Sequence, residues 1–245
     1  MAPSPPTKVL MLLFPGFNTL DMNGPYETFS KSGQSSLFKV TVTSETEITT
    51  STEGVHVKRD VALDETLIAN LAEYKILIVP GGPLRGPTTP VAVQADETTG
   101  HFMQLIEAFS KLSPPPGGAP RILLSICTGA YFLGTLGVFN GRFCTTHWAA
   151  YDQLAVRVKE TAVRTQGQAA TVLPARFVDS GINASNVRII SSGGVSCGID
   201  AALYIVKRLC SEQAAILTAQ QMDYAWRKTE GVVFGEDYGV AVARE

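Results

Sequence analysis

Histidine is scarce in this chain of 245 residues, and its few cysteines lie far apart. The sequence holds three histidines and four cysteines, and no two cysteines form a CxxC pair. Zinc sites are built from closely spaced Cys and His ligands, so we expect neither a metal nor a cofactor. Scattered cysteines of this kind are typical of reduced thiols, which favours a cytoplasmic location.

Charge of either sign is also low. Charged residues make up 17% of the chain, and the net charge is -2. Nucleic-acid-binding proteins need a basic surface, and membrane-spanning helices need a long apolar run; the sequence has neither. The first residues, MAPSPPTK, carry no export signal. We therefore expect a small-molecule substrate, with no nucleic acid and no membrane partner.

What the sequence does contain is a series of apolar runs that end in glycine turns. Strands are predicted at Val9–Pro15, Phe38–Ser44, Tyr74–Gly82 and Arg121–Ile126, and VRIISSGGVSCG repeats the strand-then-glycine pattern. Helical spacing appears at 21–30 and 104–112. Such a pattern predicts an α/β fold with a doubly wound, mostly parallel sheet, with helices on both faces and ligand-binding loops at its C-terminal edge. We see no linker or repeat, so we expect one domain over residues 1–245.

Three further segments are predicted as connections. VHVKRDVAL (55–63) is an edge hairpin or a short crossover, and residues 84–100 and 111–120 are surface connections.

The stretch RILLSICTGAYFLG has the form of a nucleophile elbow, in which a strand delivers Cys127 into a sharp turn before a helix. The backbone at Cys127 should then be strained. Free N–H groups at the start of the helix should lower the pKa of the thiol. The alternative interpretation is a buried structural thiol, because cysteine also packs well as a small hydrophobe.

Four motifs occur in one order: LLFPGFNTLDMNGPYETF, LIVPGGP, ICTGAYFLGTLGVFNGRFCTTHWAAYDQL and SSGGVSCGIDAALYIVKRL. Together they resemble the ThiJ/PfpI superfamily, and within it the isonitrile hydratase branch. The resemblance spans nearly the whole chain. It implies a flavodoxin-like sandwich of the class I glutamine amidotransferase type, and a homodimer.

The resemblance also implies roles for three residues. Cys127 would be the nucleophile, Asp21 the acidic partner that moves protons, and Thr128 the source of a hydroxyl beside the thiol. Cys127 would add to the terminal carbon of an isonitrile, and hydrolysis of the resulting thioimidate would release an N-substituted formamide. Asp21 also fits the N-cap of a helix over residues 23–30, and Glu27 is a rival acid.

The Gly81-Gly82 turn leaves backbone N–H groups uncovered, so it either binds an anion that forms on the substrate or is an ordinary glycine turn. Residues 192–194 lie at the same predicted edge. His147 could form a Cys–His dyad with Cys127, but it lies in a separate strand-like segment and the resemblance implies a structural position for it. The remaining candidates are interpreted as structural or surface residues: Cys144 and Cys197 as packed, Cys210 on a helix face, and His56 and His101 at the surface.

Two other functions remain open. One is a redox-sensing or protective protein in which Cys127 is oxidised to a sulfenic or sulfinic acid. The other is a glyoxalase-like enzyme that acts on 2-oxoaldehydes with the same thiol. Peptide hydrolysis is disfavoured by the resemblance, because the protease-like branch of the superfamily generally places a histidine directly after the nucleophile, whereas Thr128 follows Cys127 here. Transcription regulators with similar CTG and TTHW motifs append a helix-turn-helix module, and the residues after Lys207 are too few for one, so we expect no DNA binding.

Overall fold

The computed structural model describes residues 5–33, 36–85, 89–90 and 100–234. Within these residues the main sheet has eight strands. In order across the sheet they are β14 (Gly231–Val233), β12 (Phe177–Ile182), β13 (Val187–Ser192), β9 (Arg121–Ile126), β6 (Ile76–Val79), β1 (Thr7–Leu12), β2 (Phe38–Ser44) and β5 (Val61–Ala62). Neighbouring strands run parallel, except that β12 is antiparallel to β13. The predicted flavodoxin-like sheet is confirmed.

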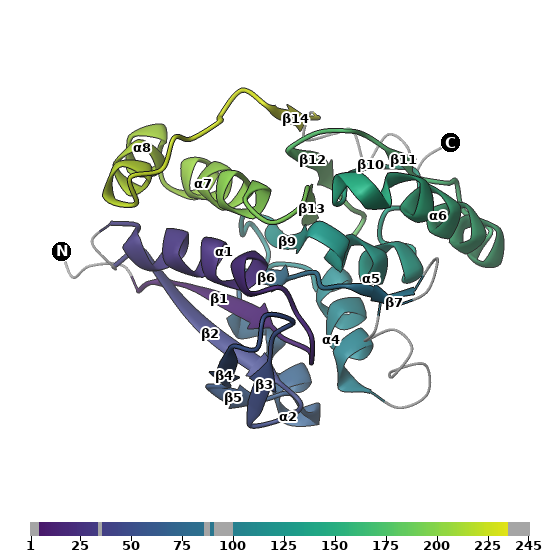
Figure 1. The fold of residues 1–245 in the computed structure, drawn as a ribbon, viewed down its shortest axis with the longest axis horizontal. Coiled ribbons are helices and arrows are strands. Elements are labelled where there is room, and N and C mark those ends of the chain that lie inside the picture. The colour runs from purple at the N-terminus through teal and green to yellow at the C-terminus, as the bar shows by residue number, and fades with distance from the viewer. Residues whose placement is uncertain (1–4, 34–35, 86–88, 91–99, 235–245) are drawn as a thin grey trace.

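Helices cover both faces of the sheet (Figure 1). On one face lie α1 (Thr19–Lys31) and α7 (Cys197–Leu209), with α8 (Glu212–Gln221) packed on α7. On the other lie α4 (His101–Ser110) and α5 (Ala130–Thr135), which contact α2 (Glu65–Ala69) and α6 (Tyr151–Thr165) respectively. None of the helices in the described ranges has the length and apolar character needed to cross a membrane.

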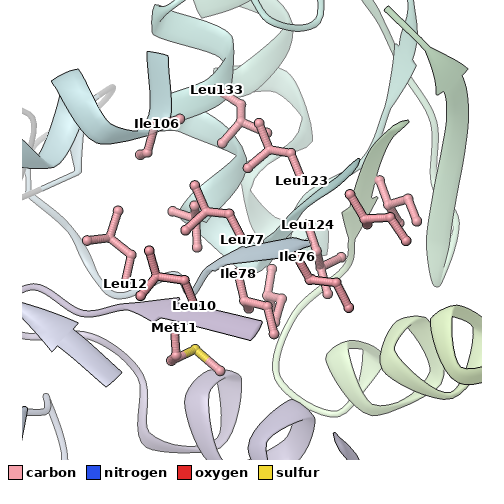
Figure 2. Packing of buried hydrophobic residues seen from close by; sticks show 14 of the residues in the cluster. Leu10, Met11, Leu12, Ile76, Leu77, Ile78, Ile106, Leu123, Leu124 and Leu133 are labelled. Carbon is pink, nitrogen blue, oxygen red and sulfur yellow. The ribbon is translucent and has the colours of Figure 1, made fainter. Parts of the chain in front are cut away.

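The central strands are mostly apolar because both faces of the sheet are covered, although β9 and β13 also bury arginine and serine side chains. Leu10, Leu77 and Leu123 are neighbours in the strand register. They point to the side where Ile106 of α4 lies, whereas Met11 points to the opposite side (Figure 2). All of these side chains are fully buried. This packing fixes the strand ends, from which the site loops leave the sheet.

Most predicted elements are found, with shifted ends. β2 and β9 have the predicted bounds, while β1 and β6 are shorter than the apolar runs that predicted them. Segment 55–63 contributes one strand of a hairpin and a separate edge strand of the main sheet. It supplies β4 (His56–Lys58), which pairs with β3 (Ile48–Thr50), and β5 at the edge of the main sheet.

Two further two-stranded sheets occur in the described residues. β10 (Phe143–Cys144) pairs with β11 (Thr171–Val172), and β7 (Leu84–Arg85) pairs with β8 (Thr89–Pro90). The second pair lies within the connection predicted at 84–100, of which 86–88 and 91–99 are outside the described residues.

Candidate active site

Loops from the carboxyl ends of four parallel strands meet at one edge of the sheet. The N–H of Asn18, after β1, donates to the carbonyl of Gly81, after β6, at 2.7 Å. The N–H of Cys127, after β9, donates to the carbonyl of Gly193, after β13, at 3.2 Å. The chain leaves β1 for β2 on one side and returns to β6 on the other, so this edge is a topological switch point, where open α/β sheets bind ligands.

A cavity of about 390 Å³ opens at this edge. Cys127 and Thr128 form part of its wall, together with Gly82, Val195 and His147. Its size falls within the range of small-molecule sites in proteins.

The backbone of Cys127 is held in a strained conformation. Its φ is 55°, in the left-handed region that residues other than glycine seldom occupy. Such a residue typically costs about 1–3 kcal/mol, which the surroundings must offset. Besides the bond to Gly193, the buried hydroxyl of Thr146 donates to the Cys127 carbonyl at 2.8 Å. The prediction of a strained backbone is confirmed.

Two glycines let the turn pack directly on the end of β6. A Cβ atom on Gly81 would lie 2.6 Å from the backbone nitrogen of Thr128, and one on Gly129 would clash with the carbonyl of Val79. No larger residue fits at either position without moving backbone. The glycines are therefore needed for the close approach of two strand ends, which brings Cys127 beside the loop after β6.

Asp21 is fully buried, although it lies in the first turn of α1. The N-cap of this helix is Asn18, whose side chain accepts from the N–H groups of Leu20 and Asp21 at 3.1 Å. The alternative interpretation of Asp21 as the N-cap is therefore wrong, because the helix begins earlier than predicted. The rival acid Glu27 is half exposed and forms an ion pair with Lys31 at 3.6 Å.

The Asp21 carboxyl faces Cys127 from a site that penalises its charged form. Its Oδ2 accepts from the Gly81 N–H at 3.0 Å. Burial raises the pKa of Asp21 to about 7, against the opposing effects of the Gly81 N–H, the Cys127 thiol and the Val195 N–H. The group can therefore both give and take a proton near neutral pH.

The pKa of the Cys127 thiol is raised to about 12, first by burial and then by the negative charge of Asp21. The N–H groups of Thr128 and Val195 face the sulfur and lower its pKa, but by less. The prediction of a lowered pKa is wrong, because it considered the local turn alone and not the buried carboxyl opposite. The resting thiol is protonated.

The Gly81-Gly82 turn is at the site, but its N–H groups are already engaged. Gly81 donates to Asp21, as described, and the Gly82 N–H donates to the Thr128 hydroxyl at 2.8 Å. The same hydroxyl donates to the Gly82 carbonyl. These bonds do not agree with an anion site at the turn, and they engage the Thr128 hydroxyl with the backbone of Gly82. The turn positions the acid and the elbow instead.

The residues interpreted as structural have varied surroundings. His147 lines the cavity, where its Nδ1 accepts from the Ala149 N–H at 3.2 Å, and burial lowers the pKa of its ring. Cys144 is buried as predicted, and Cys210 is exposed at the C-terminal end of α7. Cys197 is only half buried and borders a second cavity, so its interpretation as a packed thiol is incomplete.

Three residues of the site were missed by the sequence interpretation. Thr146 stands next to His147 in the CTTHW motif, and no residue pattern distinguishes its hydroxyl from that of Thr145. Val195 has a φ of 50°, which is unusual for a β-branched residue and turns its N–H toward the sulfur. Glu53, in the turn between β3 and β4, lines the cavity from a segment without any motif. Within the described residues, no three His, Cys, Asp or Glu side chains gather as a metal site would require.

Comparison with known proteins gives one family. The model of the DJ-1/PfpI family matches residues 7–208. Isonitrile hydratase from Pseudomonas putida is 27% identical over 218 residues, which cover 87% of this chain and 77% of that protein.

Solved structures share the fold. A ThiJ/PfpI family protein from Pseudomonas syringae superposes with a TM-score of 0.65 at 21% identity, covering 89% of this chain and 75% of the other. DJ-1 from Schizosaccharomyces pombe has a TM-score of 0.64 at 17% identity, covering 89% of this chain and all of that one. At such identities these two likenesses concern the fold alone.

Proposed function

Because the chain belongs to the DJ-1/PfpI family, we propose that it is a cysteine-dependent hydratase of small electrophiles, with isonitriles as the substrate class. One observation carries the proposal: Cys127, with a φ of 55°, lies in the cavity wall beside the buried carboxyl of Asp21. The choice of isonitriles is supported by the relative from Pseudomonas putida. The expected homodimer stays a prediction.

The first step would form a carbon–sulfur bond. The sulfur of Cys127 adds to the terminal carbon of the isonitrile while the Asp21 carboxylate accepts the thiol proton. Asp21 then passes this proton to the same carbon, which gives a thioimidate, R–N=CH–S–Cys. A carboxyl with a pKa near 7 suits this exchange, because it neither holds nor loses the proton too strongly.

The second step would release the product. Water adds to the thioimidate carbon, Asp21 takes one water proton and delivers it to the nitrogen, and the carbon–sulfur bond breaks. The hydroxyl proton returns to the sulfur as the carbonyl forms, which leaves R–NH–CHO and the free thiol. The N–H groups of Thr128 and Val195 would stabilise the sulfur as it departs with negative charge.

The direction of the thiol pKa argues against the redox alternative. Oxidation to a sulfenic acid follows thiolate character, and Cys127 is held as a thiol by burial and by Asp21. Addition to an isonitrile does not require a resting thiolate, because the proton that leaves the sulfur must be transferred to the isonitrile carbon. A neighbouring acid that relays the proton therefore suits hydration better than peroxide sensing.

The test is formamide production from a set of isonitriles by the wild type, Cys127→Ala, Asp21→Asn and Cys210→Ser. We expect no turnover without Cys127 and a loss of about 10²–10⁴-fold without the Asp21 carboxyl. Cys210→Ser removes an exposed thiol outside the site and should match the wild type. Thermal melts identify variants that fail to fold.

Turnover by Cys127→Ala would refute the nucleophile. Failure of the wild type on every isonitrile would overturn the substrate class, and lactate formation from methylglyoxal would then support the 2-oxoaldehyde alternative. A sulfinic acid formed on Cys127 by peroxide, with no turnover of any substrate, would support the redox alternative.

A further inference from the structure

A carboxylate is held by hydrogen bonds in the wall of the Cys127 cavity. Glu53 lies in the turn between β3 and β4 and borders the cavity. Its Oε1 accepts from the Asn18 side-chain amide at 2.7 Å, and its Oε2 accepts from the Thr19 N–H at 2.9 Å and from the Thr19 hydroxyl. These donors belong to the start of α1, the helix that carries Asp21, so the carboxylate has a fixed position relative to the reacting groups.

Glu53 is ionised at neutral pH. Partial burial would raise its pKa, but hydrogen bonds from Thr19, from its own backbone N–H and from the Ser51 hydroxyl together outweigh that effect and lower it. The charge also reaches the site, since Glu53 contributes to the raised pKa of Asp21.

No described cation balances this charge at the cavity wall. Among the described residues that line the cavity, Glu53 is the only one of a charged type (Asp, Glu, Lys or Arg). His147 lines the same wall, and burial lowers the pKa of its ring, which leaves it uncharged at neutral pH. Other lining side chains are small or apolar, such as Pro83, Ala149 and Ala150. A cleft with charge of a single sign concentrates ligands of the opposite charge.

We infer that Glu53 sets the charge selectivity of the cavity. It favours electrophiles whose remote end is cationic or donates hydrogen bonds, such as a protonated amine, and it disfavours those that carry a carboxylate. That these electrophiles are substrates rests on the proposed function. The selectivity itself is a property of access to Cys127 and can be measured without turnover.

The experiment compares the wild type with Glu53→Gln and with a matched control, Glu47→Gln. Glu47 precedes β3 and is 69% exposed, where it pairs with Lys58 at 3.2 Å, and it does not line the cavity. Both substitutions remove one negative charge. Cationic, neutral and anionic methanethiosulfonate reagents are applied, and the modification rate of Cys127 is read by peptide mass spectrometry. Each rate is divided by that of the same reagent with free cysteine, which removes intrinsic reactivity.

We expect the wild type to favour the cationic over the anionic reagent, and Glu53→Gln to reduce that ratio by about tenfold, as expected for two unit charges several ångströms apart near a surface. Such a change corresponds to about 1.4 kcal/mol. Glu47→Gln should keep the wild-type ratio. Equal ratios in all three proteins would overturn the inference. If Glu53→Gln fails to fold, the salt dependence of the wild type is the test. Its ratio of cationic to anionic modification rates should fall as ionic strength rises, and a constant ratio would refute an electrostatic cause.

A second measurement separates this inference from the proposed function. Isonitriles of equal size that end in an ammonium or a carboxylate are compared for formamide production, with the ammonium form expected to have the higher kcat/KM. No turnover of either isonitrile, together with charge-selective labelling, would refute the hydratase and leave the selectivity standing. Turnover without a charge preference in either assay would refute the selectivity alone.

Discussion

Replacing Asp21 by asparagine should make the protein more stable above neutral pH, because the folded structure penalises the ionised carboxyl. In the unfolded chain this group ionises near its ordinary value of 3.8, whereas in the folded protein its pKa is about 7. Between these two pH values the folded state keeps a proton that the unfolded chain has released. Stability contributed by that proton is present at low pH and is lost as the pH rises through about 7.

The magnitude follows from the same two values. Each pH unit over which only the folded state holds the proton is worth about 1.4 kcal/mol. For a pKa raised from 3.8 to about 7, the penalty above neutral pH approaches about 4 kcal/mol. Asparagine has nearly the same shape and can still accept the Gly81 N–H, but it never ionises.

The assay is urea unfolding of the wild type and Asp21→Asn from about pH 5 to about pH 8, with Asp152→Asn as the control. Asp152 is an exposed carboxylate in the first turn of α6. The free energy of unfolding of Asp21→Asn should exceed that of the wild type by an amount that grows with pH and levels off above about 7. The control should show a constant difference from the wild type. A difference for Asp21→Asn that does not change with pH would refute the claim that burial controls this carboxyl.

Two further predictions concern the activity. Thr146→Val removes the hydroxyl that holds the Cys127 carbonyl, so it should lower the free energy of unfolding by about 1–3 kcal/mol and lower kcat more than it changes KM. Thr146→Ser keeps a hydroxyl and should have the wild-type stability and kcat. Equal kcat for Thr146→Val and the wild type would contradict the positioning role. With an isonitrile substrate, kcat/KM should rise as the pH increases through about 7, because the ionised Asp21 takes the thiol proton, and Asp21→Asn should lack this rise. A wild-type profile that falls over the same range would contradict the proton relay.

Local sequence patterns were sufficient to predict the sheet and the elbow. A strand covered on both faces is mostly apolar, so runs such as Arg121–Ile126, in which Arg121 and Ser125 are the polar residues, indicate central parallel strands without knowledge of their neighbours. The glycine turns that follow these runs indicate where the strands end, and Cys127 between a strand and a glycine predicts a strained turn, which the structure has. Each of these inferences depends on residues adjacent in the chain.

The electrostatic state of the site depends on residues that are distant in the chain. The thiol pKa is decided by burial and by Asp21, more than 100 residues earlier in the sequence, and these outweigh the N–H groups of the local turn. The engagement of the Gly81 and Gly82 N–H groups is a pairing between loops of different strands. Glu53 reaches the cavity from a hairpin without a motif. The sequence by itself determined the strands, the turn and the identity of the nucleophile candidate. Desolvation and charge interaction depend on distance in space, so the tertiary structure alone decided the protonation of the Cys127 thiol.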